Sequence, residues 1–212
     1  CINLGLIYHN LKEYRTAHEI FSKTCNINDL WCYFLGFYYY EGIYVEQDYT
    51  KASELFKKSC DNGETRGCND LGLMYEDGLG VVQNYKKTEE YYTKSCDIYD
   101  MKGCFNLGRF YLDVTIMKNP DYKKASFFWK KACDGGEMLG CSNLGSLYLN
   151  GDGIAKDLEK AFKLFDKACN GQNMAGCHGL GAIYFYGSGV ARNYKKAGSL
   201  FKKACENGYF YA

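Results

Sequence analysis

Cysteine is the residue type that offers the most chemistry in this chain. The 212 residues include 12 cysteines, and the stretch KKACDGGEMLGC (130–141) places two of them eight positions apart. Near-copies of this stretch occur at 57–68, 93–104 and 166–177. Cysteine pairs form disulfides, bind zinc or act as redox centres, so their spacing and the elements that carry them must distinguish three chemistries.

A serine nucleophile is the second candidate. The run from Ser199 to Lys202 matches the Ser-x-x-Lys motif of serine β-lactamases and penicillin-binding proteins. Those enzymes also carry Ser-Asp-Asn and Lys-Thr-Gly, and neither motif occurs in this sequence. The three histidines, His9, His18 and His178, have no acidic or nucleophilic partner that the sequence makes visible. We therefore assign no catalytic residue and interpret the serine match as chance.

The elements that must position these side chains are short, repeated helices. The second cysteine of each pair recurs about every 36 residues, followed by Leu-Gly at offsets of three and four and by Tyr at an offset of seven. These offsets define one face of a helix. An Asn or Asp twelve residues before the next cysteine is a typical N-cap for a second helix, which carries a buried small residue and an aromatic residue one turn later.

A fixed period of this length predicts an all-α array of helical hairpins that stack into a solenoid. We expect a single domain over residues 1–212 with about six repeats, truncated at both ends. The expected repeats are 1–31, 32–67, 68–103, 104–140, 141–176 and 177–212.

The hairpin arrangement favours disulfides over the two other chemistries. Each pair joins the end of one helix to the start of the next, which brings the two cysteines within bonding range. Structural zinc sites use closer, converging pairs, and redox motifs use Cys-x-x-Cys, which is absent. We predict no metal or other cofactor, and five disulfides: Cys25–Cys32, Cys60–Cys68, Cys96–Cys104, Cys133–Cys141 and Cys169–Cys177. Cys1 and Cys205 would find their partners about eight residues beyond either end of the chain.

The bulk composition excludes several classes of partner. The formal net charge is +1 with 24% charged residues, so no charge bias indicates nucleic acid or a membrane surface. The longest apolar run, 30–40, is about half the length needed to span a bilayer. The 21 Tyr and 13 Phe are an unusually large aromatic content.

The motifs Leu-Gly-x-x-Tyr and Tyr-x-Lys-Ala, the DGLGV turn at 77–81 and the 36-residue period resemble the Sel1-like repeat, a relative of the tetratricopeptide repeat. The paired cysteines make the chain similar to the Helicobacter cysteine-rich proteins. This resemblance implies a right-handed α/α solenoid and a secreted bacterial protein that encounters a host. It also implies a link to penicillin-binding or β-lactamase activity, which the motifs above do not support.

In tetratricopeptide-like solenoids the first helix of each repeat lines the concave groove, at offsets of one, five, eight and nine from the second cysteine. These columns vary between repeats and mix aromatic residues with acids, one Arg and amides, as a peptide-binding groove requires. Alternatively, some of these aromatic residues pack against the neighbouring second helix. The expected lining residues are Tyr33, Phe37, Tyr40, Glu41, Asn69, Leu73, Glu76, Asp77, Phe105, Arg109, Leu112, Asp113, Ser142, Ser146, Leu149, Asn150, His178, Ala182, Phe185 and Tyr186.

We therefore expect a monomeric, non-enzymatic scaffold that binds a peptide or protein in this groove. Disulfides persist in oxidising compartments, so the periplasm or the exterior of the cell is the expected location. The partner would be a host protein or a protein of the cell envelope. Two alternatives stay open at this point: weak β-lactam binding or hydrolysis, and binding of a peptidoglycan or glycan fragment.

Overall fold

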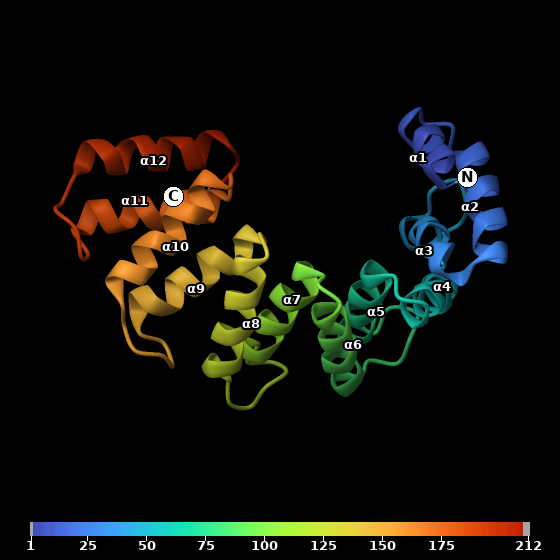
Figure 1. The fold of residues 1–212 in the computed structure, drawn as a ribbon, viewed down its shortest axis with the longest axis horizontal. Coiled ribbons are helices and arrows are strands. Elements are labelled where there is room, and N and C mark those ends of the chain that lie inside the picture. The colour runs from blue at the N-terminus through green and yellow to red at the C-terminus, as the bar shows by residue number, and fades with distance from the viewer. Residues whose placement is uncertain (1, 210–212) are drawn as a thin grey trace. The chain divides into compact units, whose positions relative to one another are not determined.

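The computed structural model describes residues 2–209, which form twelve α-helices and one short 3-10 helix without a strand (Figure 1). The predicted all-α solenoid of hairpins joined by disulfides is confirmed. In chain order the helices are α1 (Ile2–Asn10), α2 (Tyr14–Ile27), η1 (Asp29–Trp31), α3 (Cys32–Glu41), α4 (Tyr49–Asp61), α5 (Thr65–Asp77), α6 (Tyr85–Asp97), α7 (Met101–Leu112), α8 (Tyr122–Asp134), α9 (Met138–Asn150), α10 (Leu158–Asn170), α11 (Met174–Tyr186) and α12 (Tyr194–Glu206).

The chain divides into two compact units, residues 1–103 and 104–212. Within the first unit consecutive helices pack against one another, and α4, α5 and α6 lie side by side (Figure 1). Within the second unit α8 to α12 pack in the same sequential way, and α9 also contacts α11. The helix pairs that pack within the described part of each unit are therefore near neighbours in sequence, as a repeat array requires.

The second helix of most hairpins starts at the predicted N-cap. The cap carboxylate or amide oxygen accepts the backbone N–H of the residue three positions later, for example Asp48 from Lys51 at 2.9 Å. In α2, Glu13 occupies the cap position but its side chain makes no capping bond. The capping side chains are Asp48, Asn84, Asp121, Asp157 and Asn193.

The Leu-Gly column lets paired helices approach closely. A Cβ atom on Gly36 would lie 2.8 Å from Cδ1 of Phe56, and one on Gly145 would lie 3.0 Å from Cε1 of Phe165. Both rings are buried almost completely, at 1% and 3% exposure. The aromatic ring of the second helix therefore packs directly against the glycine of the first helix.

Candidate partner-binding site

Disulfides join each of four hairpins to the following one. The bonds Cys25–Cys32, Cys60–Cys68, Cys133–Cys141 and Cys169–Cys177 have Cα–Cα distances of 4.4, 4.7, 4.6 and 4.4 Å. Cys96 and Cys104 are also disulfide-bonded. Cys205 is exposed with a free thiol, while Cys1 lies outside the described residues. These bonds fix the ends of the helices that carry the expected binding columns.

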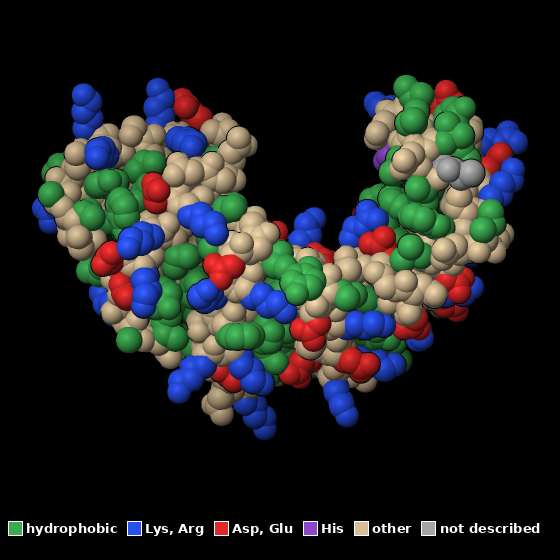
Figure 2. All heavy atoms as spheres, in the orientation of Figure 1, with side chains coloured by type: hydrophobic (Ala, Val, Ile, Leu, Met, Phe, Trp, Pro, Cys, Tyr) green, Lys and Arg blue, Asp and Glu red, His purple; other side chains and the backbone are tan. Residues whose placement is uncertain are grey.

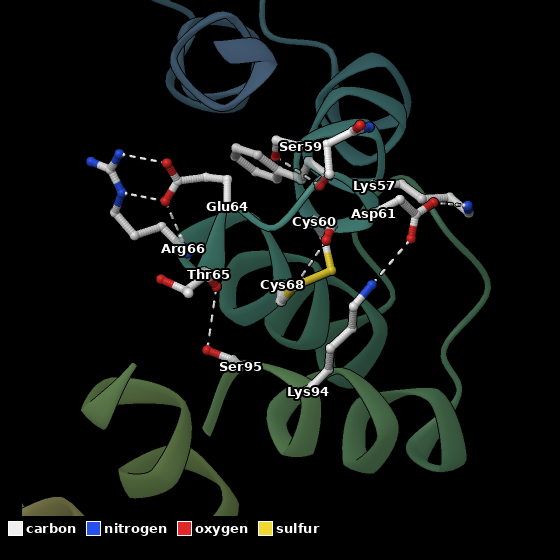
Figure 3. Close-up of a disulfide and its surroundings, with 12 residues drawn as sticks. Lys57, Ser59, Cys60, Asp61, Glu64, Thr65, Arg66, Cys68, Lys94 and Ser95 are labelled. Atoms are coloured by element: carbon white, nitrogen blue, oxygen red, sulfur yellow. Dashed lines mark hydrogen bonds and ion pairs between the residues drawn. A yellow bond between two sulfur atoms is a disulfide. The ribbon is translucent and has the colours of Figure 1, made fainter. Parts of the chain in front are cut away.

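Figure 3 shows the Cys60–Cys68 joint together with the polar groups around it. The Glu64 carboxylate accepts two hydrogen bonds from the Arg66 guanidinium, at 2.8 and 2.9 Å. On the other side of the disulfide, Asp61 pairs with Lys57 and, at 3.3 Å, with Lys94 of α6. Hydrogen bonding from Lys57 holds the pKa of Asp61 below its usual value. Apart from Glu64, the side chains of these ion pairs are about half exposed, so the disulfide and the apolar packing contribute more to holding the joint together.

Two cavities lie in the first unit beside this joint. The first pocket has a volume of about 190 Å³ and is lined by Phe37, Tyr40, Glu41, Phe56, Asp70 and Leu73. The second pocket, of about 210 Å³, is lined by Leu6, His9, Phe21, Tyr33, Phe34, Phe37, Tyr38 and Arg66. Phe37 of α3 lines both. The structure thus brings together five of the expected residues, Tyr33, Phe37, Tyr40, Glu41 and Leu73.

Charged groups border the aromatic walls of both pockets. The Arg66 guanidinium carbon lies 4.4 Å from the ring centre of Tyr33 and 4.9 Å from that of Phe34. Asp70 accepts a hydrogen bond from the Asn69 amide at 3.0 Å and is bonded by the Tyr33 hydroxyl. Burial raises the pKa of the Asp70 carboxyl, and burial likewise raises the pKa of Tyr33.

Tyr40 reports the electrostatic character of the first pocket. Its pKa is raised first by burial and then by Tyr49 and the carboxylates of Glu41, Asp70 and Asp77. Elsewhere on the surface, basic and acidic side chains are interspersed on the face drawn in Figure 2. The first pocket is therefore a locally acidic site on a protein whose formal net charge is +1.

Two of the expected lining residues in the first unit belong to the core instead. Asn69 and Glu76 are 6% and 7% exposed, and Glu76 accepts a hydrogen bond of 2.6 Å from the Tyr92 hydroxyl. At about 100° per residue, offsets one and eight lie on the flank of the packed face, about 90–110° from its centre. Smaller side chains there are covered, while large ones such as Tyr33 and Tyr40 extend to the pockets.

The expected lining residues do not include eight residues that line the pockets, among them Asp70, Arg66 and Phe56. Asp70 stands at an offset of two, which the same helical angle places beside offsets five and nine on the lining face. That angle would have identified Asp70. Arg66 precedes the cysteine, and Phe56 belongs to the buried column of the second helix, so no first-helix offset includes them.

In the second unit, several expected lining residues pack locally. Phe105 and Leu112 contact the cluster of Trp129, Leu144 and Leu147, and the Trp129 indole N–H donates to the Phe105 carbonyl at 3.2 Å. This outcome matches the alternative of aromatic residues packed against a second helix. Arg109 is half-buried. The Asp113 carboxylate accepts from Thr115, which holds the pKa of Asp113 low.

The polar lining residues of α9 are bonded within their own segment. Ser142 is buried and donates to the Leu139 carbonyl at 3.0 Å, and Ser146 donates to the Ser142 carbonyl at 3.2 Å. The Asn150 amide donates to Asp152 at 3.0 Å. Leu149 is half-buried against the core of the same unit. This surface is more polar than the lining of α3.

The last repeat presents a group of aromatic rings. The His178 ring centre lies 5.4 Å from that of Phe201 and 5.5 Å from that of Tyr209. Phe185 contacts Tyr186 at 5.0 Å, and the two side chains are 42% and 68% exposed. Ala182 is half-buried beside them on α11.

The Ser-x-x-Lys match, possible metal sites and possible membrane spans can each be compared with the structure. The Ser199 hydroxyl donates to the Lys196 carbonyl at 2.8 Å, and Lys202 lies 3.7 Å from Glu206. Both side chains thus have partners on their own helix. Within residues 2–209, no cluster of three or more His, Cys, Asp or Glu has the geometry to hold a metal ion. None of the described helices is long and apolar enough to cross a membrane.

The sequence model of the Sel1 repeat matches five segments of the chain: 32–64, 65–98, 102–137, 139–173 and 175–209. The chain belongs to the Sel1 repeat family. No curated protein sequence is significantly similar to it. The matched segments 32–64 and 65–98 include all six residues that line the first pocket.

Solved structures of Sel1 repeat proteins are similar to this chain. A Sel1 repeat protein from Oxalobacter formigenes is 26% identical with a TM-score of 0.88, over 98% of this chain and 85% of the other. The protein c5321, a protective antigen present in uropathogenic Escherichia coli strains, is 29% identical with a TM-score of 0.82; 97% of this chain spans 45% of its length. Helicobacter pylori cysteine-rich protein B is 34% identical over 59% of this chain and 90% of its own, with a TM-score of 0.47.

Proposed function

We propose that this Sel1 repeat protein is an extracytoplasmic scaffold that binds a peptide or protein along the lining face of its first helices. The observation that carries the proposal is the pair of pockets that share Phe37. Rigid aromatic side chains next to a few charged groups form the typical energetic centre of a protein interface. Each pocket is smaller than the roughly 300 Å³ or more of a site for a drug-sized molecule, which favours single side chains as occupants.

The disulfides support both the scaffold role and the location. Bonded cysteines at successive joints hold neighbouring hairpins together without any ligand. Such bonds persist in oxidising compartments and are rare in the cytosol. A surface that the disulfides already hold rigid also loses less conformational entropy when it binds a partner, and this preorganisation favours affinity.

A peptide selection followed by one substitution tests this function. Peptides are selected from a random library on the oxidised protein, and their affinities are then measured for Phe37→Ala. We expect a loss of about tenfold or more, because truncating a central aromatic anchor costs at least about 1–2 kcal/mol of binding energy. The helical circular dichroism spectrum and the free-thiol count show whether the variant is folded.

The matched control is Phe127→Ala, which removes the same side chain from an exposed position (64%) on α8. Peptides selected on the wild-type protein should bind this variant with unchanged affinity. Selected peptides that bind Phe37→Ala as tightly as the wild type would show that the shared wall of the pockets is not the binding site.

A further inference from the structure

The first pocket combines aromatic walls with carboxylates. The ring centres of Tyr40 and Phe56 lie 6.2 Å apart with their planes tilted by 46°, and Phe37 and Leu73 complete the apolar lining. Glu41 and Asp70 are the charged residues of the lining, and both are acidic. The pocket volume of about 190 Å³ suits one amino-acid side chain rather than a cofactor.

The negative charge of this pocket is not neutralised from within its lining. Asp70 is bonded by the neutral Asn69 amide and Tyr33 hydroxyl. Two cations, Arg66 and Lys102, influence the carboxyl of Asp70 from outside the pocket lining. Arg66 is already bound by both oxygens of Glu64. A cation that enters the pocket would therefore supply charge that the protein itself does not place there.

We propose that the first pocket binds a basic side chain, Lys or Arg, of the peptide partner. Aromatic faces attract a cation held within about 6 Å of the ring centre, and this attraction grows when water is excluded. A carboxylate adds charge-assisted hydrogen bonds to the same cation. This inference rests on the proposed function and names the chemistry of one residue of the partner.

The joint of α7 and α9 carries different residues at the positions that line the first pocket. In and directly after α7, Arg109 and Asp113 are equivalent to Phe37 and Glu41. In α9, Asn143 and Ser146 are equivalent to Asp70 and Leu73. An Arg replaces the ring and an amide replaces the half-buried carboxylate. A basic side chain would therefore meet the like charge of Arg109 and a single acid, Asp113, at that joint, whereas the lining of the first pocket has two acids and no cation.

The test uses two probe peptides that differ only in charge. Acetyl-Gly-Leu-Gly-Arg-Gly-amide and the same peptide with citrulline, a neutral isostere of Arg, are titrated into the full isotope-labelled chain and followed by NMR. We expect the Arg peptide to shift the amide signals of Tyr40, Asp70 and Leu73 and to bind at least tenfold more tightly than the citrulline peptide. A third peptide with Lys shows which basic group is preferred.

Asp70→Asn should weaken binding of the Arg peptide about fivefold or more and leave the citrulline peptide unaffected. The repeats themselves indicate that this variant folds, because Asn106 and Asn143 occupy the equivalent positions. The matched control Glu54→Gln removes one carboxylate from an exposed position of α4 and should change neither affinity.

Three results would overturn the inference: equal binding of both peptides, binding of the Arg peptide that is insensitive to Asp70→Asn, or no shift of the three amide signals. If both peptides bind equally and Phe37→Ala abolishes that binding, the site has no preference for charge but the proposed function stands. If selected library peptides are also insensitive to Phe37→Ala, the proposed function fails as well.

Discussion

Helices α3 and α9 are the same element of the repeat in two units, and they present different surfaces. Each carries a fully buried disulfide cysteine, Cys32 or Cys141, and a glycine that faces the aromatic ring of the following helix. At offsets of one, five and eight from the cysteine, α3 carries Tyr33, Phe37 and Tyr40, whereas α9 carries Ser142, Ser146 and Leu149.

The difference shows that packing and recognition occupy separate columns of the repeat. On α3 the large rings extend past the core and form pocket walls. On α9 the two serines donate hydrogen bonds to carbonyls of their own helix. The framework thus tolerates a complete change of lining chemistry, and its stability should depend on the shared columns and not on the lining.

Removing a disulfide should have the largest effect and should be nearly equal in the two units. Both Cys60–Cys68 and Cys133–Cys141 close loops of the same separation, eight residues. Cys60→Ala with Cys68→Ala, or Cys133→Ala with Cys141→Ala, should each lower the free energy of unfolding by about 2.5 kcal/mol on the chain-entropy estimate. Urea unfolding followed by circular dichroism measures both.

Alkylation with and without reductant, followed by intact mass, is the control for these variants. In the unreduced wild type, Cys205 should be labelled, and so should Cys1 if its partner lies outside the chain as the repeat spacing predicts. Full reduction should label all 12 cysteines. A loss at one joint several times that at the other would show that strain or packing, and not loop closure, dominates.

Replacing the glycine of the Leu-Gly column by alanine should change the free energy of unfolding by a modestly different amount in the two units. At Gly36 the new Cβ would lie 2.8 and 2.9 Å from the Phe56 ring, and at Gly145 the closest approach to Phe165 is 3.0 Å. Overpacking costs about 1–3 kcal/mol, while replacing a helical Gly by Ala returns about 1 kcal/mol. Gly36→Ala should therefore lose about 1 kcal/mol and Gly145→Ala close to nothing.

Thermal and urea unfolding of the two variants provide the measurement. The same order is expected from both methods, because both report the packed state. If Gly145→Ala is the more destabilised of the pair, the ring of Phe165 is less able to move than its spacing indicates.

The smallest effect on stability should come from replacing Asp70, which stands two residues after the disulfide cysteine Cys68. Burial raises the pKa of Asp70, so the folded protein binds a proton there more tightly than the unfolded chain does. Stability therefore falls as the pH rises through this raised pKa, and the charged carboxylate is a cost at neutral pH. Asp70→Asn should be slightly more stable than the wild type at pH 7, and this gain should vanish at about pH 3, below the usual pKa of Asp.

The reciprocal change, Asn143→Asp, should give a slight loss at pH 7 at the equivalent position of the second unit. Melting temperatures between about pH 3 and pH 7 measure both variants. A gain of Asp70→Asn that is independent of pH would show that the carboxylate charge is not its source.

Most of the framework could be predicted from the sequence because its signals repeat. The capping Asp48 and Asn84, the Leu-Gly pairs and the aromatic residue of each second helix recur at fixed offsets, and local physical chemistry determines what each does. The solenoid class and the all-α content follow from that periodicity alone.

The pockets could be predicted only in part because they form between repeats. An offset within one helix predicts that Phe37 reaches the surface, but not that Phe56 of the next helix forms a wall with it. Nor does it predict that Glu76 bonds to Tyr92, since this contact depends on the size of the side chains around it. A sequence column describes one helix at a time, whereas each pocket depends on residues of three or four helices.

The short span of each disulfide has a consequence for how the chain reaches its native pairing. The bonded cysteines are separated by only 7 or 8 residues, and other potential partners lie at about three to four times that distance along the chain or more. A fourfold longer loop closes about eightfold less readily. Native pairs should therefore form first during oxidation, each as soon as its own two hairpins meet an oxidant. Oxidative folding can then proceed from one end to the other, with little reshuffling of bonds.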